Sequence, residues 1–145
     1  MTDYDETERA ETFYRQGCRA LFEGQPAEVS DAFFRQCLAA AGDRLRYHYQ
    51  QEIVHTLFRQ IQLIQERAAD QLGGKERECQ EWEYLHLRQT GWRQRWETGR
   101  AARRARRELI KLQQHYEGKL DALRGSAGHF ALREGADTAS HQNTP

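Results

Sequence analysis

Arginine is concentrated in one stretch of the C-terminal half, TGWRQRWETGRAARRARRELIKLQ, residues 90–113. Alanines between the arginines favour a helix, and on a helix residues three or four positions apart share one face. Arginine donates bidentate hydrogen bonds to phosphate groups, and its charge releases the counterions that a nucleic acid condenses. We therefore predict that this helix face binds nucleic acid through seven residues: Arg93, Arg95, Arg100, Arg103, Arg104, Arg106 and Arg107. Such binding requires guanidinium groups that are not already neutralised by the chain's own carboxylates.

Two tryptophans lie one helical turn apart in the same stretch, Trp92 and Trp96. Indole rings at this spacing can stack on exposed bases. The two residues are also in phase with Trp82 and Leu85, which predicts that they belong to the helix core. We expect the core position.

The charges of the chain are segregated along the sequence. The 22 bases and 22 acids cancel, but residues 1–31 hold eight acids and three bases, a balance of −5. Residues 88–124 hold eleven bases and four acids, a balance of +7. An anionic partner is therefore expected at the basic end of the chain.

The arginine-rich stretch also allows other interpretations. Only three of the 22 bases are lysines, so arginine is favoured throughout the chain and not only here. The stretch could be a solvated helix face or could bind an acidic protein. The alternative function is therefore a protein–protein adaptor or inhibitor built on a long helical hairpin. A homo-oligomer is also expected, because the acidic N-terminus could bind the basic helix of a second copy.

The sequence shows no motif of a known catalytic site. It has no glycine-rich phosphate loop and no serine elbow. The pairs His48 and His55, and Cys79 and His86, are each seven residues apart. Two turns are too far for one metal ion unless the other helix contributes. We expect a non-enzymatic protein without a metal site or cofactor.

Helical periodicity predicts an all-α fold. The predicted helices cover residues 7–23 and 27–41, then a third helix that ends at Gly73-Gly74, then a helical region over residues 75–124. The first two form an N-terminal hairpin, and the last two a long antiparallel, coiled-coil-like hairpin joined at the glycine pair. Residues 1–124 are expected to form a single domain. The composition of GSAGHFALREGADTASHQNTP predicts a disordered tail over residues 125–145.

Two segments resemble parts of known families. AARRAR at residues 101–106, followed by leucines 109 and 112, resembles the basic region and zipper start of basic leucine zipper proteins, but Thr98 stands where that family has asparagine. We interpret the likeness as convergent helix chemistry. A Gln- and Arg-rich hairpin of this length is also similar in composition to the stalk proteins of secretion export gates, which fits the adaptor alternative.

Residues 11–43 resemble one tetratricopeptide-type hairpin. Gly17, Ser30, Phe34 and Cys37 fall near the small and large positions of that repeat, whereas Ala20 replaces its aromatic residue. No second copy follows, and such repeats stabilise one another by stacking. We therefore expect a generic helical hairpin.

The N-terminus, MTDYDETERAE, is acidic and has no apolar segment of a signal peptide. No run approaches the roughly 20 apolar residues of a membrane span. Cys18, Cys37 and Cys79 are odd in number and far apart, so we expect reduced and mostly buried thiols. These observations predict a cytoplasmic protein without membrane contact.

Overall fold

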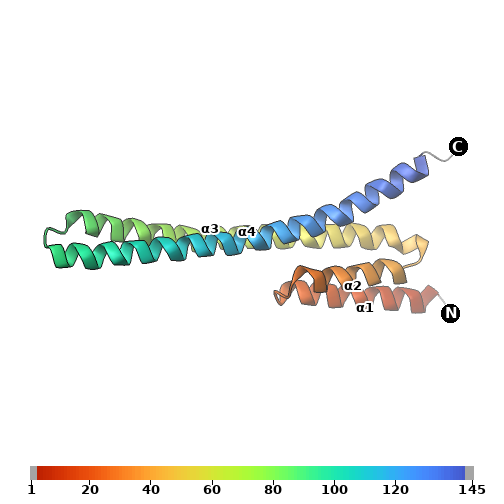
Figure 1. Ribbon diagram of the computed structural model, residues 1–145. Coiled ribbons are helices and arrows are strands. Elements are labelled where there is room, and N and C mark those ends of the chain that lie inside the picture. Colours follow the sequence, from red (N-terminus) through yellow and green to blue (C-terminus); the bar gives the residue numbers. More distant parts are fainter. Residues whose placement is uncertain (1–2, 143–145) are drawn as a thin grey trace. The chain divides into compact units, whose positions relative to one another are not determined.

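The computed structural model describes the backbone of residues 3–142 and the side chains of residues 5–132, and every element in that range is an α-helix (Figure 1). The helices are α1 (Asp3–Phe22), α2 (Ala27–Ala40), α3 (Asp43–Arg88) and α4 (Trp92–Gln142). The predicted all-α fold, with its N-terminal hairpin and its pair of long packed helices, is confirmed. The chain divides into two compact units, Met1–Gln62 with Asp121–Pro145 (unit 1) and Leu63–Leu120 (unit 2).

The turn between α1 and α2 lies where the sequence predicts it. Gly24 has a φ of +76°, in the left-handed region that glycine adopts without strain. Pro26 directly precedes α2 with a φ of −53°, and it cannot continue α1 because it lacks a backbone N–H. The two helices therefore fold back and pack against each other (Figure 1).

Unit 1 has a thick core with aromatic rings. Phe34 and Phe130 are fully buried, and their rings meet edge to face with centroids 6.1 Å apart. Gly17 makes room for this packing, because a Cβ at that position would lie 2.5 Å from Cε1 of Phe34. The other large buried hydrophobic residues of the unit are Leu21, Leu38, Tyr49, Ile53, Leu57, Ile61 and Leu123.

The tail predicted from residue 125 onward is wrong for residues 125–132. This stretch continues α4, and Ser126 and Phe130 are buried. Gln50 Nε2 donates a hydrogen bond of 2.7 Å to the carbonyl oxygen of Phe130, and Ser126 Oγ donates one of 2.9 Å to Oδ2 of Asp31. Long-range packing, which local composition cannot reveal, thus fixes the segment. The remainder of the predicted tail, residues 133–145, lies outside the residues whose side chains are described.

The turn between α3 and α4 is not at Gly73-Gly74, as predicted, but at residues 89–91. α3 continues through both glycines, at a cost of about 1 kcal/mol each relative to alanine. Packing beyond the glycine pair outweighs this cost, since Cys79 is buried there. α4 then begins at Trp92, with the Arg95 amide donating to the carbonyl oxygen of Gly91 at 2.8 Å.

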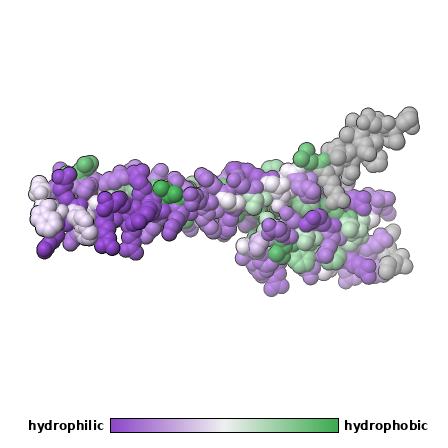
Figure 2. Space-filling view, in the orientation of Figure 1, coloured by the Kyte–Doolittle hydropathy of each residue, from purple (hydrophilic) through white to green (hydrophobic). Residues whose placement is uncertain are grey.

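Unit 2 is a two-helix hairpin with a narrow seam. Cys79 of α3 packs with Ala105 and Leu109 of α4, and the partly buried Leu72 and Trp82 flank this cluster. The small alanine leaves little depth between the helices. On the face visible in Figure 2, unit 2 is mostly hydrophilic, with paler side chains at the turn. Along residues 3–142 no helix combines the length and apolar character needed to cross a membrane.

Candidate nucleic-acid interface

Six side chains of α4 form a stripe, here called the outer stripe, on the face opposite the buried seam. Its members lie three, four or seven positions apart, whereas Ala102, Ala105 and Leu109 on the other side of the helix are buried. All members of the outer stripe are exposed: Arg93, Trp96, Arg100, Arg103, Arg104 and Arg107. Two more predicted site residues, Arg95 and Arg106, are also exposed and lie on one flank of the helix. Five of the seven predicted arginines thus lie on the face of α4 opposite the seam, and the other two are exposed on its flank.

Two of the seven arginines are paired with carboxylates. Arg104 Nε lies 3.6 Å from Oε1 of Glu108, and Arg106 Nη2 pairs with Oε1 of Glu83 on α3. The other five have no carboxylate within 4 Å among residues 5–132: Arg93, Arg95, Arg100, Arg103 and Arg107. Most of the positive charge therefore remains available to a ligand.

The core position predicted for Trp92 and Trp96 is wrong. Trp92 is 79% exposed and Trp96 is 57% exposed. Their phase relation to Trp82 has no structural meaning, because the turn at residues 89–91 interrupts the helix between them. The inward side of α4 next to the turn is instead occupied by Gly99, which is buried and packs under the ring of His86.

Guanidinium groups lie over exposed aromatic rings at three places near the turn. Cζ of Arg93 lies 5.8 Å from the ring centroid of Trp92, and Cζ of Arg100 lies 5.5 Å from that of Trp96. On α3, Arg88 approaches Tyr84 in the same way at 4.9 Å. These contacts are within the range of cation–π attraction. They place cations and flat apolar surfaces side by side.

Sequence reasoning missed a further group of exposed residues at the end of α3. Tyr84, Leu85 and Leu87 are all exposed, Leu87 by 81%. Together with Trp92 and Trp96 they form what we call the turn cluster. The dipeptide Thr90-Gly91 is the signal that could have placed a turn here, since it follows a helical segment and precedes a new one.

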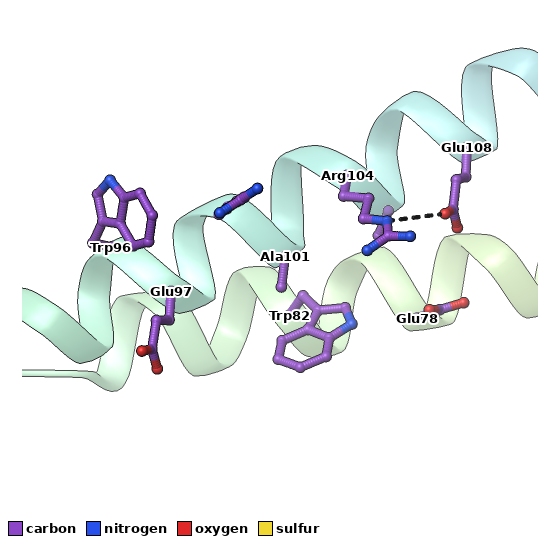
Figure 3. A pocket seen from close by; sticks show the side chains of 9 residues that line it. Glu78, Trp82, Trp96, Glu97, Ala101, Arg104 and Glu108 are labelled. Carbon is purple, nitrogen blue, oxygen red and sulfur yellow. Dashed lines mark ion pairs between the residues drawn. The ribbon is translucent and has the colours of Figure 1, made fainter.

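A groove of about 570 Å³ lies between α3 and α4 in unit 2 (Figure 3). Trp82 of α3 lies beside Ala101 of α4 in this view, and Arg104 points to Glu108. Lys75 Nζ lies 3.0 Å from Oε2 of Glu108 and 3.1 Å from Oε2 of Glu78, and it holds the pKa of Glu108 below its ordinary value. Trp96, Arg100 and Arg104 of the outer stripe border the groove. The carboxylates of Glu78 and Glu108 are thus paired within the groove with Lys75 and Arg104, whereas Arg100 at its edge has no carboxylate partner among residues 5–132.

The three cysteines are free thiols, with Cys37 and Cys79 buried and Cys18 half-buried, as predicted. Burial raises the pKa of Cys37 to about 12 and also raises the pKa of Cys79 and of Cys18. The thiols are therefore protonated at neutral pH and weak as nucleophiles. Among the described residues, no three side chains of His, Cys, Asp or Glu converge as a metal ion would require.

The outer stripe, the flanking arginines and the turn cluster thus share one helical hairpin, unit 2. An exposed row of cations with few internal partners suits a ligand that carries many negative charges along its length. The chain matches no protein-family model, no curated protein and no solved structure. Its function is therefore inferred from the side chains described above.

Proposed function

We propose that the protein is a non-enzymatic nucleic-acid-binding protein and that the seven arginines of α4 hold the phosphates. The observation that carries this proposal is the absence of carboxylate partners for five of the seven among the described residues. Residues 84–107 contain eight arginines and one acid, Glu97, a balance of +7. Such a field attracts a polyanion and accelerates its association.

The length of the outer stripe suits several phosphates. Arg93 and Arg107 are 14 residues apart, about 21 Å along a helix that rises about 1.5 Å per residue. Phosphates of one strand are spaced about 3.4 Å along a duplex axis, so the stripe spans about six of them. Contacts to phosphates carry no base information. We therefore expect weak sequence preference.

The test is charge reversal at Arg103 and Arg107, which are exposed and unpaired within the described residues. Fluorescence polarisation with a labelled duplex measures the affinity between 50 and 200 mM salt, the range over which phosphate contacts lose most affinity. Five contacts predict a slope of log K against log salt of about −4.5. The double change R103E/R107E should lower the affinity at least about tenfold and flatten the slope.

The matched control is R44E/R67E, which makes the same change in net charge at two exposed arginines outside the outer stripe. This control should retain most of the affinity. Equal losses in both variants would show a response to net charge alone, and undiminished binding by R103E/R107E would contradict the proposal.

A protein–protein adaptor or inhibitor is the second candidate function. The observation that favours it is the turn cluster, because large apolar side chains exposed around one turn are typical of interaction surfaces. It predicts a partner or a homo-oligomer whose binding is insensitive to moderate salt. Light scattering at low and high salt tests self-association. An oligomer that dissociates at high salt would indicate pairing of the acidic N-terminal segment with the basic helix.

A further inference from the structure

A second hollow, of about 420 Å³, lies on α4 next to the turn and is lined by Trp92, Arg93, Trp96 and Glu97. Both indoles are largely exposed, so their ring surfaces are available to a ligand. Arg93 lies over the ring of Trp92, and Arg100 lies over that of Trp96. The hollow thus combines flat aromatic surfaces with two cations. Bases stack on such surfaces whatever their sequence, and arginines beside them hold the phosphates of the same strand.

Glu97 is out of place in a surface that binds only phosphates. It is the one acid among residues 84–107, it is exposed, and it makes no ion pair within the described part of the chain. Figure 3 shows Glu97 and Trp96 leaving the same turn of α4 in different directions. A carboxylate repels phosphate, but it accepts hydrogen bonds from exocyclic amino groups, as glutamate does from N4 of cytosine. Its position beside the indoles therefore suits the edge of a base.

We propose that this hollow holds an unpaired base of a single-stranded nucleic acid, stacked on Trp92 or Trp96, with Glu97 accepting a hydrogen bond from its amino group. The inference rests on the proposed nucleic-acid-binding function and names the substrate class. In a duplex both faces of each base are covered by its neighbours, so only a single strand or an unpaired end can enter. Cytosine should be preferred to thymine, which presents a carbonyl oxygen where cytosine presents its amino group.

An anionic membrane is the other surface that attracts tryptophan and arginine together. Glu97 argues against it. Insertion of both indoles into the headgroup region would carry the Glu97 carboxylate, which lines the same hollow, toward an apolar medium, and this is unfavourable for a charged group without a partner. The observations therefore favour the single strand.

The experiment compares three labelled ligands at neutral pH by fluorescence polarisation: oligo(dC), oligo(dT) and a duplex of the same length. The variant W92A/W96A removes both stacking surfaces, and circular dichroism checks that its helix content is unchanged. We expect its affinity for the two single strands to fall at least about fivefold, because stacking on one base is worth that much or more. Its affinity for the duplex should change less than about twofold, because phosphate contacts remain.

Two controls make the comparison specific. L87A removes the most exposed aliphatic side chain of the turn cluster and should leave binding of single strands unchanged. E97A should abolish the preference for oligo(dC) over oligo(dT) without weakening the binding of oligo(dT). Retention of the full preference in E97A would overturn the role assigned to Glu97.

The outcomes separate this inference from the proposed function. If the wild type binds the duplex and W92A/W96A binds single strands as well as the wild type does, base stacking is overturned while phosphate binding by the arginines stands. If the wild type binds none of the three ligands, the proposed function itself is overturned. Binding to phosphatidylserine vesicles, without binding to the oligonucleotides, would overturn both in favour of a membrane.

Discussion

Units 1 and 2 are built from the same two long helices, yet they bury different kinds of side chain. Unit 1 adds α1 and α2 to segments of α3 and α4, and it encloses Phe34 and Phe130 completely. Unit 2 has only two helices, and its seam mixes small residues such as Cys79 and Ala105 with larger ones, Ile64, Leu109 and Tyr116, that each stay 6–9% exposed. Two helices cannot enclose a large side chain on all sides, so unit 2 leaves its aromatic residues near the turn in water. Unit 1 thus provides most of the buried apolar area, whereas unit 2 provides a charged surface.

The largest expected effect is on the core of unit 1. Phe34→Ala should lower the free energy of unfolding by about 3–5 kcal/mol, because it leaves a cavity at a fully buried site. Urea denaturation followed by circular dichroism measures the change. Phe58→Ala is the matched control, since Phe58 is 56% exposed on α3, and its effect should be within about 0.5 kcal/mol. Similar losses in both variants would mean that Phe34 is not the centre of this core.

In unit 2 the test is a larger side chain in the seam, in place of the smaller side chain introduced in unit 1. Ala105→Leu should lower the free energy of unfolding by about 1–3 kcal/mol, because the larger side chain forces apart two helices that meet on a buried alanine. Ala69→Leu introduces the same side chain at an exposed position of α3 in the same unit. It should be close to neutral in the same urea titration. If Ala105→Leu left the free energy of unfolding unchanged, the seam would have space for a larger side chain and the close packing described here would be contradicted.

Replacement of a helical glycine by alanine should change the free energy of unfolding in opposite directions in the two units. Gly73→Ala should raise the free energy of unfolding by about 0.5–1 kcal/mol, because the added Cβ meets nothing within 4 Å and alanine favours the helix. Gly17→Ala gains the same helix preference but pushes a Cβ against the ring of Phe34, which costs about 1–3 kcal/mol. Its net effect should be a loss of about 1 kcal/mol. Thermal unfolding of both variants checks the signs, and equal signs would contradict the packing described for Gly17.

The smallest expected effect concerns the pH dependence of unit 1. Burial raises the pKa of Asp31 above its ordinary value of 3.8, although Ser126 donates a hydrogen bond to it. The folded state therefore binds this proton more tightly than the unfolded state does. The stability that the proton provides is present at low pH and is lost as the pH rises through the folded pKa.

Asp31→Asn replaces the carboxyl group by an amide that does not titrate, so it should remove this pH-dependent loss of stability. Urea denaturation of the wild type and the variant at a series of pH values, from 3.8 to neutrality, measures the difference between them. The free energy of unfolding of the wild type relative to that of Asp31→Asn should fall as the pH rises. The other carboxyl groups are the same in both proteins, so their contributions to the pH dependence cancel in this difference. Parallel profiles would show that Asp31 has the same pKa in both states.

Local patterns sufficed to predict the all-α fold, the N-terminal helical hairpin and the exposure of the arginines. Gly24 and Pro26 end one helix and begin the next with backbone requirements that act within a few residues. The arginines of the outer stripe lie in phase opposite Ala102, Ala105 and Leu109, so periodicity alone places them in water.

Features that depend on distant contacts were not predictable in this way. Gly73-Gly74 has the composition of a turn, but the packing of Cys79 beyond it keeps α3 helical. Residues 125–132 have the composition of a linker, but Phe130 is buried against Phe34 far away in the sequence. The misplaced turn also led to the wrong burial for Trp92 and Trp96, because residues on either side of a turn share no helical phase.

The uninterrupted course of α3 through Gly73-Gly74 has a consequence for the exchange of amide hydrogens with solvent. Nothing lies within 4 Å of the place where either glycine would carry a Cβ, so few side-chain contacts are lost when the helix opens there. The amides around the pair should therefore exchange through local opening at a lower free energy than those beside the Phe34 core in unit 1. The hairpin that carries the arginines can therefore open locally at the glycine pair while the helices around the aromatic core of unit 1 remain folded.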